Sequence, residues 1–223
     1  MYSELGVTGL GMSSIAVTIV VLVIAYLMGN ISPSILIGKA KGIDIRKEGS
    51  GNPGTTNTLR VMGKKAAVVV LLVDILKGTL AVVLSGVLFG EQMAMAACAV
   101  VFIGHVWPVL FGFRGGKGVA TAFGALTGLC PWLGLGCLAV VLLAVAVTRY
   151  VSFGSIFGAL ACPVLSAFLI RPFLPYACVM AAIVIWRHRS NIVRLIHHEE
   201  NKLSFHSAGK KTEAEEEEER PEA

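Results

Sequence analysis

Charged residues are scarce in this sequence. Only 15% of its 223 residues are Asp, Glu, Lys or Arg, whereas 55% are hydrophobic. A soluble domain carries roughly a quarter charged residues, so this composition argues against a soluble domain and indicates an integral membrane protein. Carboxylates are scarcer still in the body of the chain, because seven of the 14 acidic residues lie in the last eleven positions.

Sequence motifs of several enzyme classes are also missing. The chain contains no GxSxG elbow, no HxxxxD acyltransferase motif and no Walker GxxxxGK[ST] sequence. Aspartate occurs only as Asp44 and Asp74, which argues against a paired-carboxylate metal site. The five cysteines lie in apolar segments without a CxxC pair, which argues against zinc and disulfides. We therefore expect no cofactor, and the sparse aromatic residues argue against nucleic acid as a partner.

Apolar runs predict an all-α integral membrane protein of seven helical segments. One of these segments, residues 119–129, has only eleven residues, or about 16 Å of helix. Since a full crossing needs about 20 residues, we expect a short half-bilayer helix that ends at Cys130-Pro131. The other six segments are residues 14–37, 66–89, 93–111, 131–148, 153–170 and 173–186.

The distribution of basic residues predicts the orientation in the membrane. All but two of the 19 Lys and Arg residues fall in loops and ends that would share one side. The positive-inside rule makes that side cytoplasmic, with the N-terminus outside and the C-terminus inside. We expect one membrane-embedded domain over residues 1–203 and an acidic, disordered tail over residues 204–223.

The two exceptions to this charge pattern are Arg171 and Lys77. Lys77 lies inside a predicted span, three residues after Asp74. An ionisable residue inside a membrane is either functional or paired, and the i,i+3 spacing brings these two side chains together on one helix face. A structural ion pair is the leading interpretation.

The stretch GSGNPGTTN, residues 49–57, contains no hydrophobic residue. Its glycines allow close backbone approach and positive φ, and successive free amides form an anion-binding nest. A phosphate or phosphate ester is the expected ligand, although a plain glycine-rich turn is the alternative. The match to G-x-G-x-x-G is not a dinucleotide fingerprint, because no strand precedes it. The side chains that add neutral donors are Ser50, Asn52, Thr55, Thr56 and Asn57.

Two further polar clusters lie near predicted membrane boundaries. In GFRGGKGVAT, Lys117 directly precedes the short helix, whose N-terminus offers free amides and a positive dipole end. In WRHRSNIVRL, His188 and Asn191 share one helix face. The alternatives are a membrane anchor for Lys117 and an anionic-lipid flank for the second cluster. Ser155, in RYVSFGSI, faces either these clusters or lipid.

Taken in order, GSGNPGTTN…R, HVWPVLFGFRGGKGVAT and RHRSNIVRL resemble the three signature motifs of the PlsY-type acyl-phosphate:glycerol-3-phosphate acyltransferases. The resemblance spans residues 26 to about 200 and includes DILKG and RYVSFGSI. The chain departs from the family at two positions. Thr55 stands where alanine is usual, and His198 stands where glycine usually precedes the glutamate at position 200.

The resemblance implies an enzyme of the bacterial inner membrane with its active site on the cytoplasmic face. It would transfer a fatty acyl group from acyl phosphate, supplied by a soluble PlsX-type enzyme, to the 1-hydroxyl of glycerol 3-phosphate. The products would be lysophosphatidic acid and phosphate, in the first step of phospholipid synthesis, with membrane lipid around the protein. The residues implied in catalysis are Lys117, Ser155, His188 and Asn191; those implied in substrate binding are Ser50, Gly51, Asn52, Gly54, Thr55, Thr56, Asn57, Arg60, Gly115 and Gly116.

Two other classes of function compete with this interpretation. A transporter for an organic phosphate predicts inverted repeats and polar residues near the membrane midplane, whereas the polar residues here cluster on one face. A structural lipid-binding protein has no need of three loops rich in hydrogen-bond donors. We therefore favour the enzyme.

Overall fold

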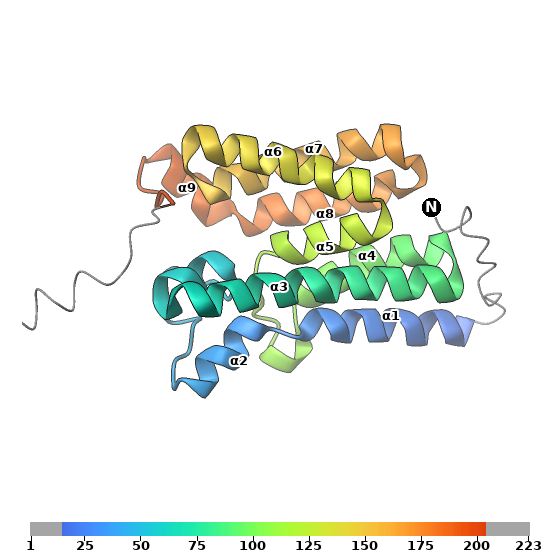
Figure 1. Ribbon diagram of the computed structural model, residues 1–223, viewed down its shortest axis with the longest axis horizontal. Coiled ribbons are helices and arrows are strands. Elements are labelled where there is room, and N and C mark those ends of the chain that lie inside the picture. The colour runs from blue at the N-terminus through green and yellow to red at the C-terminus, as the bar shows by residue number, and fades with distance from the viewer. Residues whose placement is uncertain (1–14, 204–223) are drawn as a thin grey trace, which may run out of the picture.

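The computed structural model describes residues 15–203, which form helices and loops without a β-strand (Figure 1). The all-α prediction is confirmed over this range, and the acidic tail lies outside the described residues. One group of packed helices comprises α1 (Ile15–Asn30), α3 (Thr55–Phe89) and α4 (Glu91–Val106). A second comprises α6 (Pro131–Thr148), α7 (Val151–Leu169) and α8 (Leu174–Arg187). Between the two groups lies α5 (Val119–Leu129), which contacts α3, α4 and α6.

Short elements gather at one end of the molecule. The helix α2 (Pro33–Ala40), the start of α3 and the helix α9 (Arg189–Ile196) lie at the same end, on the left in Figure 1. Two 3-10 turns complete the description: η1 (Val109–Phe111), after α4, and η2 (Arg171–Phe173), before α8. All three polar sequence clusters belong to the end that holds α2 and α9.

The outer surface of the helix bundle is apolar. Val147 is 78% exposed and Phe168 is 85% exposed, and soluble proteins rarely expose extensive surface of this kind. Four helices are long and apolar enough to cross a membrane, and α1 with α2, bent by 44°, makes a fifth candidate within the described chain. The protein is therefore a multi-pass membrane protein. The count of seven segments and the orientation of the termini remain predictions.

Prolines set several helix boundaries. The predicted half-helix is confirmed at Val119–Leu129, and α6 begins at Pro131 as expected. The single span predicted over 14–37 is instead broken between Asn30 and Pro33, because a proline disfavours helical backbone at the residue before it. Pro108 acts in the same way, so that α4 ends at Val106 and only the turn η1 follows.

A glycine divides α3 into two parts. Gly63 has φ 81° and ψ 179°, outside the helical region, and glycine reaches this φ without a steric penalty. The first part, residues 55–62, starts at the polar loop. The second part, residues 64–89, is the apolar span. The helix therefore changes direction between the polar end of the molecule and the membrane-spanning part.

A buried cluster of charged and polar side chains ties the first helix group together. Lys77 Nζ lies 2.7 Å from Asp74 Oδ1, which confirms the predicted ion pair. The same amine donates to the Ile31 carbonyl at 2.5 Å, in the break between α1 and α2, and to His105 Nδ1 on α4 at 2.9 Å. All three side chains are buried. Lys77 thus connects α3, α4 and the α1–α2 break, and His105 is a member of the cluster that sequence reasoning missed.

We predict that Lys77→Met strongly destabilises the protein, because it leaves the Asp74 carboxylate buried without its cation. Removing one partner of a buried pair costs about 3–5 kcal/mol. The measurement is denaturant-induced unfolding in detergent micelles. The control is Lys41→Met, since Lys41 is an exposed lysine near the end of α2. Adding Asp74→Asn to Lys77→Met should recover part of the loss. Equal stability of Lys77→Met and Lys41→Met would contradict this account.

Candidate active site

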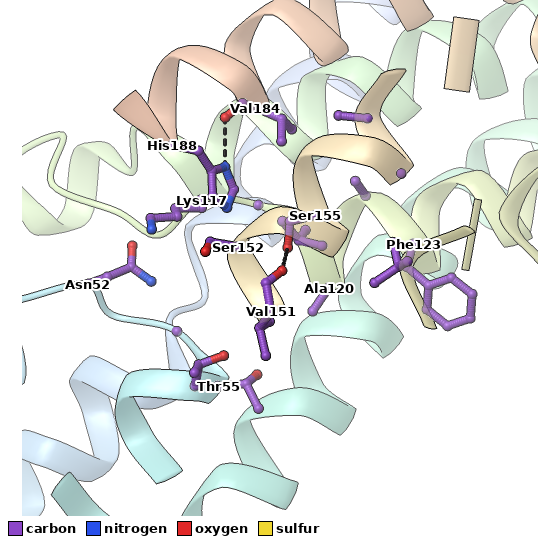
Figure 2. Close-up of a pocket in the computed structure, with 18 of the residues that line it drawn as sticks. Asn52, Thr55, Lys117, Ala120, Phe123, Val151, Ser152, Ser155, Val184 and His188 are labelled. Atoms are coloured by element: carbon purple, nitrogen blue, oxygen red, sulfur yellow. Dashed lines mark hydrogen bonds between the residues drawn. The ribbon is translucent and has the colours of Figure 1, made fainter. Parts of the chain in front are cut away.

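A cavity of about 500 Å³ opens between the two helix groups. We call the part lined by the loops and by α9 its polar end. The part lined by α5, α6, α7 and α8, with Leu71 and Ile75 of α3, is its apolar end. Figure 2 shows Asn52, Lys117 and His188 around the polar end, with Ser152 and Ser155 on α7 and with Ala120 and Phe123 further along α5. The structure thus brings residues of all three sequence clusters to one space.

Three helix N-termini open on this cavity. The first residues of α3, α5 and α7 are Thr55, Val119 and Val151, and all three line it. None of these helices has a side-chain cap, so first-turn amides remain available as donors. Each N-terminus also carries the positive end of the helix dipole. The arrangement favours anions, and it adds the start of α7 to the two sites expected from the sequence.

Asn57 lines the cavity, and its side chain also has a structural role in the first loop. Its side chain accepts a hydrogen bond from the Ser50 amide at 2.9 Å and donates to the carbonyls of Ile45 at 3.2 Å and Glu48 at 2.9 Å. The residue is 1% exposed. Because both ends of the amide are engaged within the loop, Asn57 fixes the shape of residues 45–57. Gly51, with φ 69°, contributes a left-handed turn to the same loop.

Other residues of the first polar loop, residues 49–57, keep hydrogen-bond donors available for a ligand. The Asn52 side chain lines the cavity and makes no hydrogen bond to another described residue. The Thr55 hydroxyl oxygen is buried and likewise lacks a partner in the described part of the chain. Gly54 is the N-cap of α3. The remaining predicted residues of this region that line the cavity are Ser50, Thr56 and Arg60.

The second polar loop, residues 112–118, packs tightly against α4. A Cβ on Gly115 would overlap the His105 carbonyl oxygen, and one on Gly116 would overlap the His105 ring. Arg187 holds the loop from the other side, because its Nη2 donates to the Gly115 carbonyl at 2.8 Å and to that of Gly116 at 3.3 Å. Gly115 and Gly116 therefore position Lys117 through packing. Sequence reasoning missed this clamp, although Arg187 adjoins His188 in the third cluster.

A chain of hydrogen bonds orients Lys117. Its Nζ donates to Asn191 Oδ1, and Asn191 Nδ2 donates to Glu200 Oε1 at 2.7 Å. Glu200 also accepts hydrogen bonds from Ser152 Oγ on α7 at 3.0 Å and from Arg194 Nε at 2.7 Å. Burial alone would raise the pKa of Glu200, but the bonds from Asn191, Arg194 and Ser152 outweigh it and lower the pKa. Glu200 is thus an ionised anchor that was not selected from the sequence.

The turn after α9 explains one departure from the family pattern. His198 has φ 59°, a left-handed conformation that glycine adopts more readily than other residues. The turn is closed by a hydrogen bond from the Glu199 amide to the Arg194 carbonyl at 2.8 Å. Histidine at this position therefore preserves the chain reversal that returns Glu200 to Asn191.

Burial shifts the titration of two site residues. Desolvation, with the nearby guanidinium groups of Arg194, Arg187 and Arg60, lowers the pKa of Lys117 to about 8, against the opposing effect of Glu200.

Desolvation and the charge of Lys117 lower the pKa of His188 to about 4. His188 Nδ1 lies 2.8 Å from the Val184 carbonyl, which can only accept, so Nδ1 carries the proton and Nε2 is an acceptor. His188 is therefore neutral at physiological pH.

Ser155 completes the predicted catalytic set. Its hydroxyl donates to the Val151 carbonyl of its own helix at 2.8 Å, as Figure 2 shows. The residue is buried and lines the cavity, so it faces the site and not lipid. Because its proton is engaged, the oxygen of Ser155 is available to the cavity as an acceptor.

Comparison with known proteins agrees with this geometry. The model of the family described as glycerol-3-phosphate acyltransferase matches residues 19–198. The chain belongs to that family. A glycerol-3-phosphate acyltransferase of Clostridioides difficile (strain 630) is 45% identical over 194 residues, which cover 83% of this chain and 95% of the relative. That of Halalkalibacterium halodurans is 46% identical over 189 residues, with 80% and 92% covered.

Solved structures show the same fold. The crystal structure of PlsY (YgiH), an integral membrane glycerol 3-phosphate acyltransferase, in its glycerol 3-phosphate form, matches with a TM-score of 0.80 and 36% identity. The match covers 84% of this chain and 96% of that one. Its lysophosphatidic acid form matches with a TM-score of 0.77. The protein is thus an integral membrane glycerol-3-phosphate acyltransferase of phospholipid synthesis, and the resemblance inferred from its motifs is confirmed.

We predict that Glu200→Ala lowers acyltransferase kcat/KM at least tenfold while the helices stay folded. The change removes hydrogen bonds to Asn191, Arg194 and Ser152, and one bond to a charged group contributes about 1.5–3 kcal/mol. The matched control is Glu199→Ala, because Glu199 is the exposed neighbour and should tolerate the change. Turnover of each variant with varied glycerol 3-phosphate measures the effect. Equal activity of the two variants would refute the anchoring role.

Proposed function

We propose that the protein transfers a fatty acyl group from acyl phosphate to the 1-hydroxyl of glycerol 3-phosphate and releases lysophosphatidic acid and inorganic phosphate. The observation that supports this proposal is the continuity of the cavity. Its polar end combines three helix N-termini with Lys117, and its apolar end lies among five helices, α3 and α5 to α8. A phosphate that carries a fatty chain needs both environments, and a second anionic substrate needs further donors at the polar end.

The proposed reaction needs no nucleophile from the protein. The hydroxyl oxygen of glycerol 3-phosphate attacks the carbonyl carbon of the acyl phosphate, which is a mixed anhydride. The bond from that carbon to the phosphate oxygen then breaks, and phosphate leaves. The hydroxyl proton passes to a phosphate oxygen. Lys117 and the amides at the starts of α3, α5 and α7 hold the anionic groups and stabilise the charge on the leaving phosphate.

His188 fits a binding role better than a role as general base. A base whose pKa is about 4 has little affinity for the proton of an alcohol, and an efficient general base has a pKa near the working pH. Its Nε2 instead accepts a hydrogen bond from a hydroxyl of glycerol 3-phosphate. Asn191, through its contact with Lys117, and Ser155, on the opposite wall, complete the positioning of this substrate.

A basic pocket adjoins the polar end and fits the approach of anionic substrates. It has a volume of about 210 Å³ and shares Ser50, Asn52 and Lys117 with the main site, while its other walls include Arg187 and Arg189. We propose that it faces the cytoplasm in the bacterial inner membrane. Glycerol 3-phosphate, and acyl phosphate delivered by a soluble PlsX-type enzyme, would enter on this side.

We expect purified protein to release inorganic phosphate and form lysophosphatidic acid only when acyl phosphate and glycerol 3-phosphate are both present. Lys117→Ala should abolish this activity, because a cation is lost at the anion site. The exposed arginine Arg114, in the same loop, provides the control Arg114→Ala, which should keep activity within a few-fold of the wild type. Transfer from another acyl donor but not from acyl phosphate would overturn the proposed donor.

The pKa of Lys117 predicts an alkaline limb in the pH profile. As the pH rises through about 8, Lys117 in the free enzyme loses its proton and no longer attracts phosphate, so kcat/KM for glycerol 3-phosphate falls. Below about 6 the second ionisation of the substrate phosphate lowers kcat/KM as well. Lys117→Arg should be slower but should lose the alkaline limb, because a guanidinium stays protonated. His188→Gln should retain both limbs; loss of its acidic limb would support the base role.

A further inference from the structure

The apolar end of the cavity has a defined depth. Two of its helices, α5 and α7, run away from the polar end, whereas α6 and α8 run toward it. The deepest lining residues are therefore the last on α5 and α7, Leu126 and Cys162, and the first on α6 and α8, Cys137 and Met180. We call these four residues the floor.

The next turn of each of these four helices is closed. Leu129 on α5 and Leu133 on α6 are 2% and 0% exposed, and neither lines the cavity. Ser166 on α7 and Ala177 on α8 are each 0% exposed and also lie outside it. Along these four helices the cavity ends at one level above a packed layer, and on α3 the lining stops at Ile75.

Cys137 and Cys162, two residues of the floor, lie on α6 and α7, which pack against each other. One turn nearer the polar end, Ala159 has a small side chain at the cavity wall, while Gly158 packs closely against Val141 of α6. Along these helices the cavity therefore continues above the floor and ends at it.

We propose that the floor sets the length of the acyl chain that this enzyme transfers. This inference rests on the proposed function and names the residues that select the donor. Val151 and Cys162 are eleven residues apart on α7, or about 16 Å of helix, which is roughly half the hydrocarbon core of a bilayer. A chain that reaches the floor meets the packed layer, where additional methylenes find no space.

Burial of each methylene above the floor should raise kcat/KM about fourfold, and the gain should stop where the chain meets the floor. Longer chains should then react more slowly, because overpacking a well-packed core is unfavourable. A homologous series of saturated acyl phosphates, tested at fixed glycerol 3-phosphate, measures this profile. The wild type should show one optimum.

Two variants should move this optimum in opposite directions. Met180→Ala removes part of the floor and should favour longer chains, by about fourfold in kcat/KM for each methylene newly accommodated. Ala159→Leu fills the cavity one turn above the floor and should favour shorter chains. The matched control is Met93→Ala, because Met93 is a buried methionine on α4 that does not line the cavity; its optimum should stay at the wild-type length.

The thiols provide a second measurement that needs no turnover. Without glycerol 3-phosphate, acyl phosphates should slow the alkylation of Cys137 and Cys162 by N-ethylmaleimide once the chain is long enough to reach them. Cys178 is exposed on α8 and lies outside the cavity, so its alkylation should not depend on chain length. Mass spectrometry of the labelled peptides distinguishes the sites.

The outcomes separate this inference from the proposed function. Identical chain-length profiles in the wild type and both cavity variants, or protection of Cys162 that does not depend on chain length, would overturn the role of the floor. Length-dependent protection without transfer from any acyl phosphate would instead overturn the proposed reaction and support the floor as a measure of chain length. Opposite shifts in Met180→Ala and Ala159→Leu, with none in Met93→Ala, would support both.

Discussion

The structure depends on the placement of one cation in a partly desolvated position. Lys117 lies where three helix dipoles and several guanidinium groups already favour negative charge. The carboxylate of Glu200 opposes the lowering of its pKa, and Asn191 separates the two side chains. The result is an unsatisfied positive potential, because a direct salt bridge would have neutralised the site. Under the proposed function, a phosphate group of the substrate supplies the missing negative charge.

Support for this site comes from inside the membrane part of the fold. The second loop lies directly on His105, which is hydrogen-bonded to Lys77 and to Thr121 at 3.1 Å on α5. Lys77 in turn holds Asp74 and the break between α1 and α2. The buried polar cluster thus links the helix packing of the first group to the loop that carries Lys117. The cluster that the sequence predicted as an ion pair within the membrane therefore also supports the candidate active site.

The sequence predicted what short-range patterns encode. Residues 119–129 formed the expected half-helix because composition and Cys130-Pro131 fix both its length and its end. The pair Asp74 and Lys77 followed from helical spacing alone. The anchoring by Glu200 depends on a chain reversal at His198. Because this position is not a glycine, the sequence did not indicate the reversal. The carbonyl clamp of Arg187 depends on how α8 crosses the second loop, and no local pattern carries that information.

Asn57 illustrates the same limit within a motif that was correctly recognised. A polar loop near a membrane needs internal hydrogen bonds as well as hydrogen-bond donors for a ligand. Residue type alone does not show which side chains bond within the loop and which are available to a ligand. The structure assigns Asn57 to the loop and leaves the Asn52 side chain without a described partner. The depth of the cavity was equally beyond the sequence, since it depends on the relative heights of four helices.

The contact between the second loop and α4 has a consequence for how such a protein can change over time. At Gly115 and Gly116 there is no space for even a methyl group, so variation at these positions is closed to every other amino acid. The apolar end has a comparable restriction only at Gly158 among the glycines that line it, where a Cβ would lie 2.4 Å from Val141, while Leu126 and Met180 present larger apolar side chains to the cavity. Under the proposed function, substitutions among these larger side chains would change which acyl chains react, while the loop that carries Lys117 would stay the same.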